Sequence, residues 1–112
     1  MTRLSDSKAL ALAGVFLSIS AAMHLSAIIV AGLHFSTFLF LVIGLIYLSI
    51  ARTYLGRSDL WTWPGLILMG IGIPGALIMI HFGSAVPNWW LWPIVVLDVA
   101  VVLSLLWFLW RR

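Results

Sequence analysis

The sequence predicts an all-α integral membrane protein whose four transmembrane helices form an up-down bundle. The first observation is composition: 64% of the 112 residues are hydrophobic and 8% are charged, whereas soluble domains carry about 25% charged residues. The second is that the apolar residues form long continuous runs, which favour helices over the alternating pattern of a membrane β-barrel. The third is that most charges lie outside those runs, as expected when lipid surrounds the spans.

Four apolar runs define the predicted spans, and each is long enough to cross the hydrocarbon core as a helix. They occupy residues 9–31, 37–55, 64–83 and 90–110. The connections between them are short, so they leave no room for a domain outside the bilayer. We therefore expect residues 1–112 to form a single four-helix transmembrane domain with the lipid bilayer as its surroundings.

Residues with known preferences for helix ends bound several of these spans. Asp6 or Ser7 is a suitable N-cap for the first span, and Gly32 is a suitable end for it. Ser36 is a suitable N-cap for the second span. Pro64 fits the first turn of the third span, where its missing N–H leaves no hydrogen bond unmade.

The basic residues predict the orientation of the chain in the membrane. All of them precede the first span, flank the second connection or end the chain, and they are Arg3, Lys8, Arg52, Arg57, Arg111 and Arg112. The positive-inside rule places such residues in the cytoplasm. We therefore expect an inner-membrane protein with both termini cytoplasmic.

The tryptophans support that orientation, because tryptophan gathers at the two membrane interfaces. One group is expected at the cytoplasmic interface and comprises Trp61, Trp63, Trp107 and Trp110. The other is expected at the outer interface and comprises Trp89, Trp90 and Trp92.

Several kinds of function are excluded or disfavoured by the sequence. The chain has no cysteine, which excludes disulfides, thiolate metal sites and cysteine nucleophiles. Its net charge of +3 comes from residues at span ends, so it reports topology and predicts no nucleic-acid partner. No Walker, Rossmann or zincin motif is present.

Asp98 and His24 are the most informative polar residues. Asp98 lies about eight residues inside the fourth span, or roughly 12 Å deep, where an unpartnered acid costs at least ~2.5–3.5 kcal/mol. His24 lies at a similar depth in the first span, on one helix face with Ser20, Ala27 and Ala31. We expect a structural or functional Asp98–His24 pair, since the first and last spans are neighbours in an up-down bundle.

The three histidines and Asp98 also suggest a metal site. His34 lies in the first connection and His81 near the end of the third span, so both share the outer half of the membrane with His24 and Asp98. Imidazole and carboxylate together suit Cu, Zn or non-haem Fe. Haem is less favoured, because His24 and His81 differ in depth. A structural role for each histidine is the competing interpretation.

The third span contains an irregular stretch. Pro74 cannot hydrogen-bond to the carbonyl of Gly70 and is expected to kink the helix. Gly70, Gly72 and Gly75 give this helix a structural role, since they allow close approach of another backbone or of a cofactor ring. The freed carbonyl is a candidate partner for Asp98. Tyr47 of the second span is expected near the cytoplasmic interface.

The function predicted from these features is that of a small accessory or structural subunit of a larger membrane complex. Respiratory, photosynthetic and membrane monooxygenase assemblies use such subunits, and no catalytic residue set is visible, so catalytic activity of the chain on its own is not expected. Other membrane subunits or a second copy would be its partners. The alternatives are a metal- or haem-binding membrane protein and a proton- or ion-coupled transporter with Asp98 as its coupling site.

Overall fold

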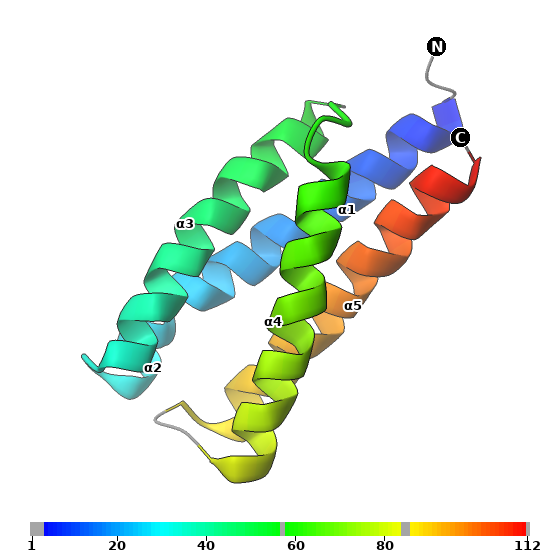
Figure 1. Cartoon of the computed structure of the whole chain (residues 1–112). Helices are drawn as coiled ribbons and strands as arrows, with labels where there is room; N and C mark the ends of the chain where they lie inside the picture. The colour runs from blue at the N-terminus through cyan, green and yellow to red at the C-terminus, as the bar shows by residue number, and fades with distance from the viewer. Residues whose placement is uncertain (1–3, 57, 84–85, 112) are drawn as a thin grey trace.

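A computed structural model describes residues 4–56, 58–83 and 86–111, and the regular structure in these ranges is entirely helical (Figure 1). The helices are α1 (Leu4–Leu25), α2 (Ala27–Ala31), α3 (Phe35–Leu55), α4 (Thr62–Phe82) and α5 (Asn88–Arg111). Four segments are long and apolar enough to cross a membrane, namely Lys8–Ala31, Phe35–Leu55, Thr62–Phe82 and Asn88–Trp110. The prediction of four helices that are long and apolar enough to span a membrane is confirmed.

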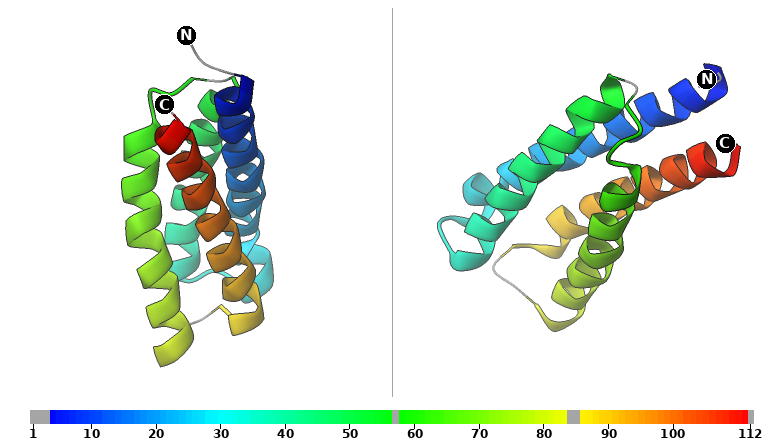
Figure 2. Two further views of the ribbon diagram at one scale, coloured as in Figure 1. Left: turned by 90° about the vertical axis from the view of Figure 1, so that its right-hand side faces the viewer. Right: turned by 45° about the horizontal axis from the view of Figure 1, so that its top comes forward.

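The helices pack around α1, which contacts both α3 and α5, while α4 packs on α5. The molecule is elongated and measures 45 × 22 × 19 Å (Figure 2). The start of α1 and the end of α5 lie at one end of it, here called the terminal end, and α2 lies at the opposite or far end (Figure 1). Lys8 and Arg52 lie toward the terminal end, whereas Arg3, Arg57 and Arg112 fall outside the described residues.

Two groups of buried apolar side chains hold the helices together. The larger group joins α1, α3, α4 and α5 and includes Leu17, Tyr54 and Phe108. The smaller one lies at the far end and includes Ala27 and Trp90. The buried face of α5 follows helical three- and four-residue spacing and includes Trp90, Ile94, Asp98, Val101, Leu105 and Phe108. Asp98 is therefore carried into the interior by the same face that packs the core.

The first span is divided at Ser26, which the sequence did not predict. The Ser26 N–H bonds to the carbonyls of Ala22 and Met23, at 3.1 Å each. Its hydroxyl donates to the Met23 carbonyl at 2.6 Å and accepts the Trp90 Nε1–H at 3.1 Å. Because these bonds satisfy the polar groups at the break, the chain can change from α1 to α2 within the membrane span.

The helix ends differ in detail from the predicted signals. α1 already begins at Leu4, so Asp6 and Ser7 lie inside its first turns and do not cap it. The N-cap of α3 is His34 and not Ser36. The Thr37 hydroxyl explains this, because it accepts the His34 N–H and donates to the Gly32 carbonyl, each at 2.8 Å. These bonds fix the turn between the first two spans.

The irregular stretch of the third span remains one helix, since α4 continues through Pro74. Of its three interior glycines, Gly72 is the one approached by another part of the chain. A Cβ atom built on Gly72 would lie 2.9 Å from the Tyr47 hydroxyl, whereas one on Gly70 or Gly75 would meet nothing within 4 Å. The space beside Gly70 and Gly75 is therefore open.

Candidate functional site

The polar residues at the centre of the molecule meet where α1, α3, α4 and α5 converge. Ser20 of α1 donates its hydroxyl hydrogen to Asp98 Oδ1 of α5 at 2.7 Å. The Ser20 Oγ also lies 3.5 Å from His24 Nδ1. Asp98 and His24 thus belong to one cluster, as their matching depth predicts, but Ser20 connects them in place of a direct bond among the described residues. Asp98 bonds to Ser20 and not to the Gly70 carbonyl.

The hydrogen bonding of His24 determines which ring nitrogen carries the proton. His24 Nδ1 lies 2.7 Å from the backbone carbonyl of Ser20. A carbonyl can only accept, so Nδ1 is the protonated nitrogen and Nε2 of the neutral ring is an acceptor. The part of the chain that the structure describes offers Nε2 no hydrogen-bond partner.

Aromatic side chains surround His24. Its ring centroid lies 4.9 Å from that of Tyr47 in an edge-on arrangement, 5.6 Å from that of Phe40 and 6.3 Å from that of Trp90. Phe40 and Trp90 are themselves in edge contact at 5.0 Å. These contacts hold the imidazole in a fixed orientation.

Tyr47 belongs to this cluster and not to the membrane interface, so the predicted position of this residue was wrong. Side chains on a helix lean toward its N-terminus. Since α3 begins at the far end, the ring of Tyr47 leans away from the terminal end and toward His24. Its hydroxyl has no hydrogen-bond partner within residues 4–56, 58–83 and 86–111.

A cavity of about 220 Å³ lies beside this cluster and separates α3 from α4. Its walls are mainly apolar and come from three further helices as well as α3, with the lining His24, Phe40, Ile43, Tyr47, Ile71, Gly72, Gly75, Ala76, Met79, Ile94 and Asp98. The polar members are almost completely buried, with exposed fractions of 3% for Tyr47, 4% for His24 and 1% for Asp98. The cavity therefore has an apolar entrance and a polar floor.

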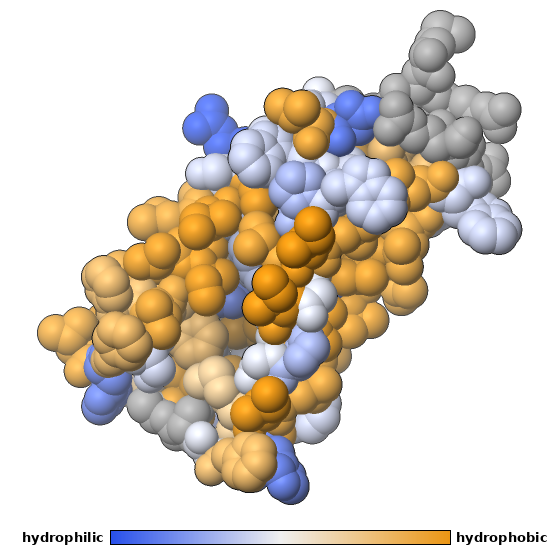
Figure 3. All heavy atoms as spheres, in the orientation of Figure 1, coloured by the Kyte–Doolittle hydropathy of each residue, from blue (hydrophilic) through white to orange (hydrophobic). Residues whose placement is uncertain are grey.

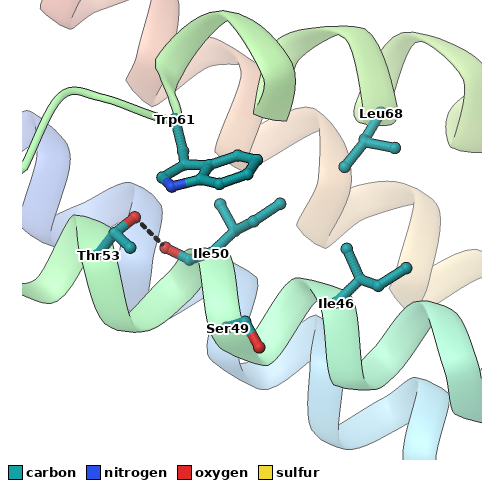
Figure 4. A pocket seen from close by; sticks show the side chains of 6 residues that line it. All are labelled: Ile46, Ser49, Ile50, Thr53, Trp61 and Leu68. Atoms are coloured by element: carbon teal, nitrogen blue, oxygen red, sulfur yellow. Dashed lines mark hydrogen bonds between the residues drawn. The ribbon is translucent and has the colours of Figure 1, made fainter.

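Further cavities continue this opening along the line between α3 and α4, which we call the seam. One of about 140 Å³ lies toward the far end, and one of about 100 Å³ lies between Ile43 and Gly72 toward the terminal end. Beyond it, a cavity of about 310 Å³ is lined by Trp61 and Leu68 on one side and by α3 residues, among them Ile50, on the other (Figure 4). The surface view shows this face hollowed between two hydrophobic ridges (Figure 3).

The four predicted metal ligands are not assembled by this arrangement. His34 and His81 are exposed, and the ring of His81 packs against Phe82 with centroids 4.7 Å apart. Within the described ranges, no group of three or more His, Cys, Asp or Glu side chains is placed to hold a metal ion. Metal binding by His24, His34, His81 and Asp98 thus gains no support from the structure.

The floor of the cavity presents hydrogen-bonding groups without a protein partner. Tyr47 offers a hydroxyl that can donate or accept, and His24 Nε2 can accept. Asp98 Oδ2 lies 3.9 Å from a Cβ built on Gly72, so it lies next to α4 at the edge of the cavity. Such a floor can bind an uncharged molecule with polar atoms that enters from the bilayer.

Sequence reasoning missed Tyr47, Phe40 and Trp90 as members of the site. The spacing of Trp90, Ile94 and Asp98 by four residues contained the signal for Trp90, because it puts all three on one helix face. Comparisons of the chain with models of protein families, with curated proteins and with solved structures give no match.

Proposed function

We propose that this chain is a small subunit of a larger membrane complex and that it holds a lipid-soluble molecule in the seam between α3 and α4. The observation that carries the proposal is the polar floor of the cavity. Tyr47, His24 and Asp98 are buried there, and each keeps a polar atom that no described residue bonds.

The energetics of burial favour an occupant. A buried polar atom without a hydrogen bond costs roughly 1–3 kcal/mol, and the cost is not relieved by apolar lipid tails. A bound molecule that pairs with these atoms would recover part of that energy. The seam gives such a molecule a direct route from the bilayer, since its entrance is lined by side chains such as Ile43 and Ile71.

The role as a subunit is supported by the exposure of α4. In the most apolar stretch of α4 only 17% of the residues are buried, compared with 44% in that of α5. Its large exposed side chains include Trp63, Ile67, Ile71 and Ile78. Such a helix faces either lipid or other membrane proteins, which makes respiratory, photosynthetic and monooxygenase assemblies the proposed setting.

The proposed arrangement is an up-down bundle with both termini in the cytoplasm and the far end at the outer side of the inner membrane. The basic residues support this orientation. Reporter fusions at Asp59 and Arg112 are expected to read cytoplasmic, and one at Asn88 external. A periplasmic signal at Asp59 would reverse the orientation.

The proposal is tested by gentle purification followed by native mass spectrometry and identification of co-purifying proteins. We expect an extra mass of a non-covalent lipid-soluble compound, which Tyr47→Phe weakens. The control is Tyr54→Phe, because Tyr54 lies in the seam but outside the 220 Å³ cavity. A protein that carries no such compound and no partner subunit would contradict the proposal.

Ion-coupled transport remains the alternative for Asp98, because a buried acid within a span is the usual coupling group. Transport and binding predict different results in vesicles. A coupled transporter would move protons when its substrate is added to purified protein in liposomes, whereas a binding subunit would not. Asp98→Asn separates the two further, since it removes coupling while it keeps an oxygen that can accept the Ser20 hydrogen bond.

A further inference from the structure

The cavity in the seam has two unlike walls. On α4 its wall is formed by Ile71, Gly72, Gly75, Ala76 and Met79, and it is open at Gly75, where a Cβ would meet nothing within 4 Å. On α3 its wall includes the rings of Phe40 and Tyr47. A flat group fits between the open backbone at Gly75 and the rings on α3, because rings stack or pack edge-on against it.

The floor offers a ligand both acceptors and donors of hydrogen bonds. His24 Nε2 can only accept, since the proton is on Nδ1. Asp98 Oδ2 is the carboxyl oxygen that Ser20 leaves unbonded. The Tyr47 hydroxyl completes the set and can also donate. The polar atoms that match this floor are hydroxyl groups, which donate to His24 or Asp98 and accept from Tyr47.

The remainder of the seam is apolar and narrow. The volume lined by Ile43, Ile46, Leu68 and Ile71 beside Gly72 is about 100 Å³, before the seam widens to about 310 Å³ near Trp61. A helix with its side chains is about 10–12 Å wide, whereas an extended hydrocarbon chain is far thinner. The seam beside the polar floor therefore suits a chain and not a helix of another subunit.

We infer that the occupant is a flat hydroxylated ring that carries an apolar chain, with the ring between Phe40 and Gly75 and the chain along the seam. This is the chemistry of a prenylated quinol. The inference rests on the proposed function, because it names the ligand class of the same cavity. It includes no redox step.

Binding of four decyl compounds to the purified protein tests the ligand class. Native mass spectrometry under anaerobic conditions without added reductant compares decylubiquinol, decylubiquinone, decylbenzene and 1-decanol. Decylbenzene has a ring and chain without oxygens, and 1-decanol has a hydroxyl and chain without a ring. We expect decylubiquinol to bind at least about tenfold more tightly than either of these, because decylbenzene lacks the hydroxyl groups that pair with the floor and 1-decanol lacks the ring that packs on Phe40. The affinity for decylubiquinone is expected to lie between the affinity for decylubiquinol and the affinities for decylbenzene and 1-decanol.

Two glycine variants locate the ring. Gly75→Leu places a side chain in the open space of the cavity and should abolish binding of decylubiquinol. Gly70→Leu is the matched control, because its Cβ also meets nothing within 4 Å but Gly70 does not line this cavity. It should bind like the wild type. Thermal melting of both variants verifies that each is folded.

The possible failures are distinct. Equal binding of decylubiquinol and 1-decanol would overturn the ring but leave the proposed lipid-soluble ligand intact. Equal binding of decylubiquinol and decylbenzene would overturn the recognition of the hydroxyl groups by the polar floor. Loss of binding in Gly70→Leu as well as Gly75→Leu would overturn the location. Failure of every decyl compound to bind, with no co-purified lipid, would remove both the inference and the proposed function.

Discussion

The two halves of the seam contain the same pair of residue types, a tyrosine on α3 that faces a glycine on α4, but the two tyrosine hydroxyls differ in their hydrogen bonding. Toward the terminal end, Tyr54 of α3 faces Gly65 of α4, and its hydroxyl donates to the Trp61 carbonyl at 2.6 Å. Toward the far end, Tyr47 faces Gly72, but its hydroxyl has no bond within the described part of the chain. The tyrosines are seven residues apart, and so are the glycines. The Tyr54 contact therefore closes the seam, whereas the Tyr47 contact leaves a hydrogen-bonding group facing it.

The start of α4 accounts for this difference. Trp61 immediately precedes the first helical residue, Thr62, and its carbonyl accepts both the Gly65 N–H at 2.9 Å and the Tyr54 hydroxyl. A carbonyl has two lone pairs, so it can accept both bonds. Gly72 lies in the middle of α4, about ten residues from either end of the helix. Tyr47 therefore meets no helix end.

The largest expected effect on stability comes from a larger side chain in the half of the seam at Tyr54 and Gly65, here called the closed half; the half at Tyr47 and Gly72 is called the open half. Gly65→Leu should lower the free energy of unfolding by about 3 kcal/mol, because its Cβ would collide with the Tyr54 hydroxyl and overpack the helix contact. Detergent-based denaturation of the purified protein measures it. Gly70→Leu is the control and should cost far less, since nothing lies within 4 Å of its Cβ. Equal losses would show that α4 tolerates no large side chain anywhere.

Removal of the Ser20 hydroxyl tests the polar floor of the open half. Ser20→Ala should lower the free energy of unfolding by about 2 kcal/mol, since it leaves Asp98 Oδ1 buried without a donor. The double variant Ser20→Ala with Asp98→Leu should recover most of that loss, because both polar partners are then absent. Ser18→Ala is the control, as Ser18 bonds only to the Gly14 carbonyl of its own helix. A double variant as unstable as Ser20→Ala would contradict the pairing.

The two tyrosine hydroxyls provide a direct comparison. Tyr54→Phe should lower the free energy of unfolding by about 1 kcal/mol, because it removes the bond to the Trp61 carbonyl. Chemical denaturation under the conditions used for the glycine variants measures it. No change in stability would mean that the closed half depends on ring packing and not on the hydrogen bond.

The smallest effect on stability is expected for Tyr47→Phe. It should cause no loss in the free energy of unfolding, since no protein hydrogen bond is lost and the removal of an unpaired buried hydroxyl is favourable in the ligand-free protein. The same variant should weaken ligand binding, which native mass spectrometry measures. A loss as large as that of Tyr54→Phe would show that the Tyr47 hydroxyl is structural, and the contrast between the two halves would disappear.

The positions of the spans were predictable because hydrophobic length depends on sequence alone. The run predicted at 64–83 corresponds to Thr62–Phe82, and that at 37–55 to Phe35–Leu55. The break at Ser26 was not predictable in the same way. It depends on a hydrogen bond from Trp90, a residue 64 positions further along the chain.

The candidate site was predictable in part. Asp98 and His24 were expected to be near each other because they lie at equal depth on spans that neighbour one another. Depth along a helix does not tell which side chain reaches which, so the bridging role of Ser20 required the structure. The placement of Tyr47 failed because distance from a helix end neglects the direction in which a long side chain leans.

The tyrosine–glycine contacts also limit how this chain can evolve. At either contact, a side chain larger than hydrogen on α4 needs a shorter residue on α3, since the tyrosine hydroxyl occupies the space. In descendants of this gene, positions 47 and 72 are thus expected to covary, and positions 54 and 65 as a separate pair. The open pair would be free to drift when the ligand changes, while the closed pair would be retained under selection for folding alone.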